Sequence, residues 1–93
     1  MKKRRKPRST WFVYMLECEG NRIYTGVAVD VEARFEKHRA GKGAAFTRIN
    51  KPLRMLASMK CRGQSAATRK EYALKQLSRD EKLRWARVHR STL

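Results

Sequence analysis

The sequence predicts a small α+β domain with its elements in the order β-β-α-β-α-α. Two apolar runs of strand length joined by a glycine-containing turn lead to this prediction, together with helical segments that begin at capping residues. The chain has 93 residues, enough for one small core, and its hydrophobic content of 41% is too high for a wholly disordered protein. We therefore expect a basic flexible arm over residues 1–10 and one folded domain over residues 11–93.

The first two strands are predicted to form a hairpin. Residues 11–16 (WFVYML) are apolar or aromatic without a break, and residues 22–27 (RIYTGV) form a second run of strand length. Gly20 and Asn21 supply the turn between them. Because the first run has apolar side chains on both faces, we expect a central strand that helices cover on both sides.

A helix is predicted over residues 31–39. Asp30 is suited to cap its N-terminus, Gly41 ends it, and the glycine-rich segment that follows is expected to be a loop. At 100° per residue, Arg34 and His38 fall on the apolar face of this helix. Two polar side chains on that face call for a chemical explanation.

The second half of the chain is predicted to contain a third strand and two helices. The strand covers residues 53–59, and Ser65 is suited to cap a helix that runs to about Leu77. Ser78 and Glu81 match a capping box, in which each satisfies a free backbone N–H of the other, and so start the last helix.

The charge of the chain indicates a polyanionic partner. Lys and Arg number 24 against eight Asp and Glu, a net charge of +16, so nucleic acid is the expected partner. A ribosome-type structural protein, a binder of anionic membranes and a merely basic surface are the alternatives. The arm is expected to contact phosphate, although a solvated tail without function or a nuclear-localisation cluster also fits its composition. Its basic residues are Lys2, Lys3, Arg4, Arg5, Lys6 and Arg8.

The two cysteines and the N-terminus suggest a reducing, cytoplasmic setting. Cys18 and Cys61 match no zinc-binding spacing and are interpreted as ordinary thiols, with a single disulfide as the alternative. The charged N-terminus lacks the apolar region of a signal peptide, and no apolar run reaches the length of a bilayer. We expect no membrane association and no obligate protein partner, and in a bacterium an association with the nucleoid.

A phosphodiesterase site needs an activated water and positive charge near the developing negative charge. With eight acidic residues in the chain, a two-metal cluster would have to gather several of them. One Mg²⁺ or Mn²⁺ held by one glutamate, phosphate and water is within reach. Glu71, the only acidic residue of its predicted helix, fits that role.

The order of these residues resembles the GIY-YIG nucleases. The motifs are VYM at residues 13–15, YTG at residues 24–26, Arg34, His38 and, in a later helix, Glu71. The likeness covers about residues 11–83 and is greatest to the small single-domain branch. It implies a three-stranded antiparallel sheet flanked by helices, with both tyrosines, the arginine and the glutamate on one face. In this sequence Phe46 stands where relatives often have a tyrosine.

The resemblance also implies roles for the site residues. Arg34 would stabilise charge on the scissile phosphate, and Glu71 would bind the single divalent metal ion. Tyr14 or Tyr24 would help to deprotonate the attacking water, and His38 would position a phosphate or transfer a proton.

A tyrosine acts as a base only if its pKa is lowered, here by Arg34, Lys42 or the metal. Gly26, Lys42 and Arg48 are expected to contact nucleic acid together with the arm, although Gly26 is also suited to a strand bulge. The conventional interpretations of the remaining residues are core tyrosines, an arginine at the core edge, a packed histidine and a surface ion pair between Glu71 and Lys75.

The function predicted from the sequence is therefore a metal-dependent endonuclease that hydrolyses phosphodiester bonds in nucleic acid, with DNA preferred over RNA. The alternative is a catalytically idle basic module that binds DNA or RNA through its charge. A protein associated with RNA or the ribosome would share most of the same surface.

Overall fold

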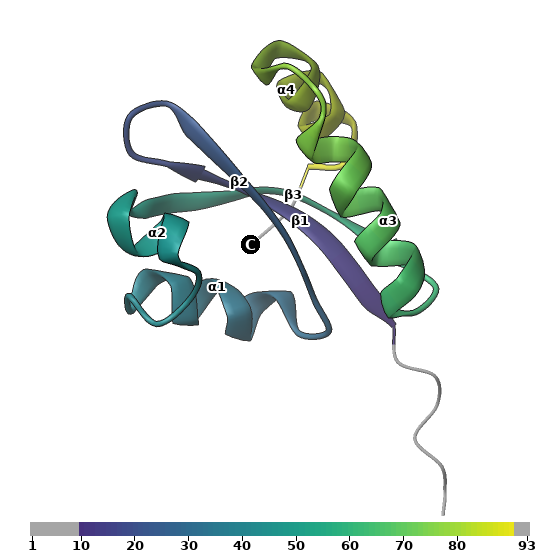
Figure 1. Cartoon of the computed structure of the whole chain (residues 1–93), viewed down its shortest axis with the longest axis horizontal. Helices are drawn as coiled ribbons and strands as arrows, with labels where there is room; N and C mark the ends of the chain where they lie inside the picture. The colour runs from purple at the N-terminus through teal and green to yellow at the C-terminus, as the bar shows by residue number, and fades with distance from the viewer. Residues whose placement is uncertain (1–9, 91–93) are drawn as a thin grey trace, which may run out of the picture.

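The computed structural model describes residues 10–90 of the chain. The basic residues of the predicted arm all lie outside this range. The described residues form a three-stranded antiparallel sheet in the order β2-β1-β3, flanked by helices (Figure 1). This confirms the predicted fold class.

The elements follow the predicted order with one addition. The strands are β1 (Trp11–Cys18), β2 (Arg22–Ala28) and β3 (Pro52–Cys61), and the helices are α1 (Val31–Arg39), α2 (Ala45–Ile49), α3 (Gln64–Lys75) and α4 (Arg79–Val88). Helix α2 lies in the segment that was expected to be a loop. Its five residues are too few to show a helical repeat, and the glycines before it favoured a loop.

The hairpin turn confirms the sequence signal. Gly20 and Asn21 both have positive φ angles, 76° and 60°, which is the backbone of a tight turn between twisted antiparallel strands. Strand β1 then pairs with β2 on one side and with β3 on the other, so it is the central strand.

Both faces of β1 are covered, as predicted. Val13 and Met15 face a cluster that contains Leu74 of α3 and Ala86 of α4. On the opposite face, Tyr14 belongs to a second cluster, against which α1 packs. Figure 1 shows α1 and α2 on one side of the twisted sheet and α3 and α4 on the other. The site described below is built on the α1 side.

The helix caps agree with prediction at two of three positions. The carboxylate of Asp30 accepts a hydrogen bond from the backbone at the start of α1, and Ser78 and Glu81 form the expected capping box of α4. Ser65 does not cap α3. Gly63, with φ of 94°, is the cap residue instead, and the Ser65 hydroxyl lies in the first turn and accepts a hydrogen bond from Arg69.

Two smaller findings concern the cysteines and the helices. Cys18 is buried, Cys61 is half-buried, and both are free thiols, as expected from their spacing. Between residues 10 and 90, no helix combines the length and the apolar character needed to cross a bilayer.

Candidate active site

Two tyrosines from neighbouring strands share the face of the sheet that α1 covers. Tyr14 pairs with Gly26 across the β1–β2 ladder, and Leu16 pairs with Tyr24, so the tyrosines are diagonal neighbours. Their ring centroids are 6.3 Å apart. Tyr14 is 1% exposed, whereas Tyr24 is only partly buried and retains contact with solvent.

A chain of buried hydrogen bonds runs from Tyr14 into α2. The Tyr14 hydroxyl lies 2.8 Å from Nε2 of His38, and Nδ1 of His38 lies 2.6 Å from Oγ1 of Thr47. The Thr47 hydroxyl donates to the carbonyl of Ala44 at 3.0 Å. Because its proton is used there, Thr47 accepts from Nδ1–H, which leaves Nε2 as the acceptor for Tyr14. The histidine is therefore held as one neutral tautomer.

This hydrogen-bond chain engages both ring nitrogens of His38. The side chain is 1% exposed and both ring nitrogens are engaged, so it has no free donor for a phosphate. Burial and, to a lesser extent, the charge of Arg34 lower the pKa of His38. A neutral, buried imidazole that accepts a hydrogen bond from the Tyr14 hydroxyl holds α1 and α2 against β1.

Thr47 was not identified from the sequence. It belongs to the short helix α2, and nothing in the pattern around it indicates a contact with His38. A polar residue on the buried face of α1 was a signal that a partner exists, but not where the partner lies.

Gly26 makes room for Tyr14. A Cβ atom placed at this glycine would lie 2.7 Å from the Tyr14 hydroxyl and 2.9 Å from Cε2 of Tyr24. Gly26 is itself buried, and its pairing with Tyr14 lies in a regular stretch of the β1–β2 ladder. The regular pairing corrects the interpretation of Gly26 as a strand bulge, and a contact of this glycine with nucleic acid stays a prediction. The glycine is required by the ring that packs on it.

Arg34 brings a positive charge to the tyrosines from α1. It lies one helical turn before His38, and its side chain is exposed. Its charge lowers the pKa of Tyr14, Tyr24 and His38, although burial is the largest influence on all three. The guanidinium is thus close to the buried site and open to a ligand from solvent.

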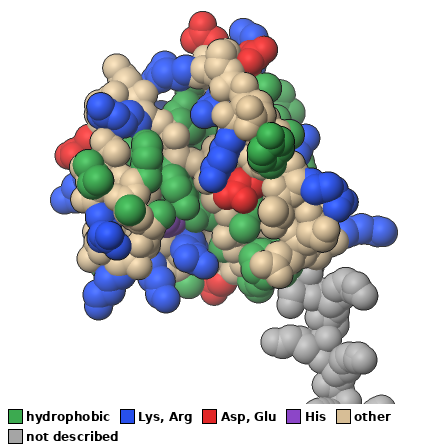
Figure 2. All heavy atoms as spheres, in the orientation of Figure 1, with side chains coloured by type: hydrophobic (Ala, Val, Ile, Leu, Met, Phe, Trp, Pro, Cys, Tyr) green, Lys and Arg blue, Asp and Glu red, His purple; other side chains and the backbone are tan. Residues whose placement is uncertain are grey.

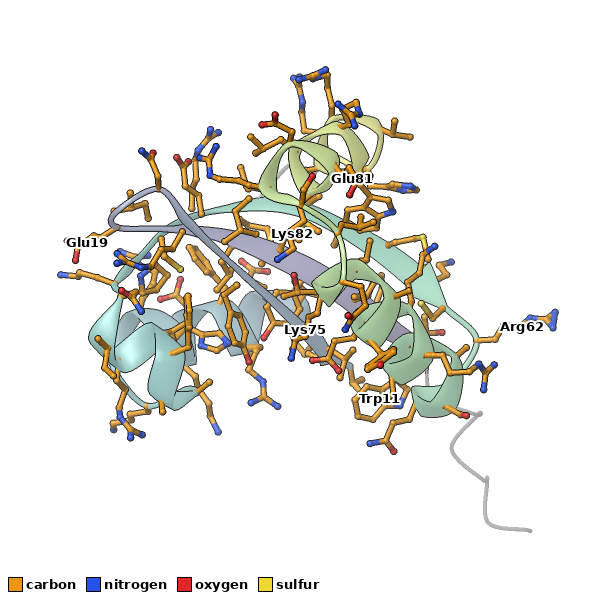
Figure 3. The ribbon with its side chains drawn as sticks, turned by 45° about the horizontal axis from the view of Figure 1, so that its top comes forward. Trp11, Glu19, Arg62, Lys75, Glu81 and Lys82 are labelled. Carbon is orange, nitrogen blue, oxygen red and sulfur yellow. The ribbon has the colours of Figure 1, made fainter. Side chains whose placement is uncertain are left out.

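Glu71 approaches the same tyrosines from α3. Its side chain is 20% exposed, and its carboxylate forms an ion pair with Lys75 at 3.2 Å, the surface contact that its i+4 spacing allowed. Its charge raises the pKa of both Tyr14 and Tyr24, and Lys75 lowers that of Tyr24. Glu71 and Lys75 thus act electrostatically on the phenols from α3. Figure 3 shows Lys75 extending from α3 toward the middle of the molecule.

The phenols do not meet the expectation of a lowered pKa. Burial raises the pKa of Tyr14 and of Tyr24, and it outweighs the opposing effect of Arg34. Lys42, which was expected to contribute, is not among the charges that act on the pKa of either tyrosine. Both hydroxyls are consequently neutral at physiological pH.

The carboxylate of Glu71 is suited to bind a single hard cation. Across residues 10–90, no three His, Cys, Asp or Glu side chains converge as a ready-made metal cluster. Mg²⁺ commonly binds through one or two carboxylates and completes its shell with water and substrate phosphate. The partly exposed oxygens of Glu71 match that pattern, so the residues present fit one such ion.

The surroundings of the site are basic and partly aromatic. Lys42 and Arg48 are exposed on the segment that joins α1 to α2 and on α2 itself. Phe46 lies 5.7 Å from Tyr24 between ring centroids, so the aromatic contact is present although a phenylalanine offers no hydroxyl. Figure 2 shows Lys and Arg side chains spread over this face, with an acidic group near its middle.

Comparisons with known proteins agree with the family resemblance and the fold. The GIY-YIG catalytic domain family matches residues 10–84 of the chain. A UPF0213 protein of Cupriavidus pinatubonensis is 47% identical over 73 residues, which cover 78% of this chain and 81% of that protein. A UPF0213 protein of Staphylococcus aureus is 40% identical over 73 residues, which cover 78% of this chain and 89% of that protein. The solution NMR structure of a UPF0213 protein from Bacillus halodurans matches with a TM-score of 0.55 and 37% identity, covering 89% of this chain and 88% of that one.

Proposed function

This chain belongs to the GIY-YIG family, and we propose on that basis that it is a metal-dependent endonuclease that hydrolyses phosphodiester bonds in DNA. The observation that carries the proposal is the grouping of Tyr24, Arg34 and Glu71. These three side chains come from β2, α1 and α3, and each retains exposed or partly exposed atoms. A cation, a carboxylate and a phenol in one basic surface are the groups that phosphodiester hydrolysis needs.

In this proposal, Arg34 and Tyr24 touch the substrate. The guanidinium of Arg34 stabilises negative charge that develops on the scissile phosphate. Tyr24 has a raised pKa, so its neutral hydroxyl orients the attacking water by accepting a hydrogen bond from it. Tyr14 and His38 are each 1% exposed and act as positioning residues behind Tyr24.

Glu71 would hold one divalent ion, Mg²⁺ or Mn²⁺. When bound, such an ion lowers the pKa of coordinated water and neutralises charge on the phosphate. Lys75, at 3.2 Å from Glu71, balances the carboxylate. Beside Arg34, it adds a second cation to the site.

The test is a cleavage assay with matched controls. Purified protein is incubated with branched, nicked and single-stranded DNA and with RNA, with and without Mg²⁺. We expect Mg²⁺-dependent cleavage that is lost in Glu71→Gln and Arg34→Ala, while binding measured without Mg²⁺ persists. Glu36→Gln and Arg39→Ala are the controls, because these residues form an exposed ion pair at 3.4 Å on α1.

The competing function is a binding module that uses the net charge of +16 and has no catalytic turnover. Wild-type protein that binds every substrate but cuts none of them, with either Mg²⁺ or Mn²⁺, would establish that function. Equal cleavage by wild type and Glu71→Gln would show that the nuclease site lies elsewhere.

A further inference from the structure

A hollow of about 280 Å³ lies beside the site, between the start of β1, the end of β2 and the first turns of α1. Its walls include Trp11, Val29 and Ala33, and its cationic lining comes from Arg34 and Lys37. Asp30 also lines the hollow. One oxygen of that carboxylate is engaged in capping α1, through a hydrogen bond from the Ala33 amide at 3.0 Å.

Most of the apolar wall of the hollow lies outside the protein core, and Ala28 is the one core residue, of those that the structure describes, that lines it. Among residues 10–90, Trp11 belongs to neither hydrophobic cluster, and Val29 is 47% exposed. Trp85, by contrast, packs against one cluster and stacks on His89 at 4.4 Å between ring centroids. Trp11 is partly buried, and an indole with some exposed surface on a strongly basic protein is suited to stack on a planar, uncharged group attached to an anion.

Arg34 connects the hollow to the proposed active site. The same side chain lines the hollow and acts on the phenols of Tyr14 and Tyr24. A phosphate bound by Arg34 would therefore lie beside the hollow. The next group along a nucleic-acid strand is a sugar with its base, and the hollow is the apolar space next to that phosphate.

We propose that this hollow is a nucleobase subsite, in which Trp11 stacks on the base next to the scissile phosphate while Lys37 contacts the adjoining phosphate. The proposal rests on the proposed nuclease function and adds a substrate class to it. A base inside a duplex is stacked on both sides and paired at its edge, so it does not reach Trp11 without leaving the helix. The preferred substrate has an unpaired nucleotide beside the cleaved bond.

Tryptophan fluorescence tests the subsite without any need for cleavage. In a Trp85→Phe background, Trp11 is the only tryptophan, because the chain has two. The protein is titrated in EDTA with a single-stranded oligonucleotide, with a fully paired duplex of the same sequence, and with an oligonucleotide of abasic sites. We expect strong quenching by the single strand, and weak quenching by the duplex and by the abasic strand. Figure 3 places Trp11 at the lower end of the sheet, near the N-terminal side of β1.

Binding by variants supplies the second readout. Trp11→Ala should weaken single-strand binding about tenfold, the usual effect of losing one stacked base, and leave abasic-strand binding unchanged. Trp11→Phe retains a ring and should recover most of the affinity. Lys37→Ala should weaken binding of all three ligands more than Lys51→Ala does, since Lys51 is exposed and does not line the hollow.

Three outcomes would overturn the subsite. The first is that a single strand binds the protein but does not quench the fluorescence of Trp11. This measurement uses protein with Trp11 intact, so it does not depend on whether the Trp11 variants fold. The second is equal quenching by the abasic strand. The third is an equal loss of affinity for all ligands in a folded Trp11→Ala protein. Quenching without cleavage would contradict the nuclease function alone, and cleavage without quenching would contradict the subsite alone.

Discussion

Replacing Thr47 with valine removes the end of the hydrogen-bond chain while keeping the shape of the side chain. The hydroxyl of Thr47 accepts from His38 at 2.6 Å and donates to the carbonyl of Ala44 at 3.0 Å, and the residue is 2% exposed. Without it, Nδ1–H of His38 has no acceptor. If the imidazole changes tautomer instead, Nε2 carries the proton and the Tyr14 hydroxyl loses its acceptor.

Either response leaves a buried donor unpaired, and the cost follows from that. An unsatisfied buried polar group costs about 1–3 kcal/mol, so we expect Thr47→Val to lower the free energy of unfolding by about 2 kcal/mol. With a urea m-value of about 1 kcal/mol/M for a chain this small, the unfolding midpoint should fall by about 2 M.

Thr25→Val is the matched control, measured by urea unfolding followed by circular dichroism. Thr25 is also 2% exposed, but within residues 10–90 its hydroxyl has no hydrogen-bond partner. Replacing it with valine removes an unsatisfied group from a strand, so stability should stay the same or rise. Equal destabilisation by the two substitutions would refute the reasoning, because it would show that the cost comes from packing and not from the hydrogen bonds.

Three further predictions use the same unfolding assay. Burial lowers the pKa of His38 below its ordinary 6.5, so the unfolded chain binds the proton more readily than the folded one. The free energy of unfolding should therefore be at its full value above about pH 6.5 and fall toward pH 5. A pH profile just as steep in His38→Gln would contradict this. Ser78→Ala should cost about 1 kcal/mol through loss of the capping box, whereas Ser65→Ala should change little, and similar effects would exclude the assigned caps. Gly26→Ala should destabilise by about 1–3 kcal/mol and reduce cleavage, since its Cβ would meet the Tyr14 ring; unchanged stability would show that the ring moves freely.

The sequence predicted the elements whose signals are local. The turn at Gly20 and Asn21, the Asp30 cap and the capping box of α4 depend on residues a few positions apart, and all were confirmed. The cap of α3 was predicted wrongly, because Ser65 is a good cap residue by type while the backbone turn that starts the helix occurs at Gly63. Residue preferences rank the capping candidates but do not determine the backbone angles.

The sequence named candidate members of the site, but it did not predict the hydrogen-bond partner of His38 or the pKa values of the phenols. The buried polar face of α1 correctly indicated that His38 has hydrogen-bond partners, but Thr47 is reached through a contact between α1 and α2 that no periodicity encodes. Burial and the charge of Glu71 raise the pKa of Tyr24, and the charge of Lys75 lowers it. Both charged residues are distant from Tyr24 in the sequence. Such a balance is set by tertiary packing and is visible only in three dimensions.

The most direct test of a shared active site is a double-mutant cycle on the single-turnover rate of DNA cleavage in Mg²⁺. The variants are Tyr24→Phe, Arg34→Lys and the two combined, which are conservative enough to leave a measurable rate. Groups that act on the same phosphate and water should be non-additive, so the combined loss should be smaller than the product of the two single losses. A combined loss equal to that product would place the two side chains in independent roles and contradict the site.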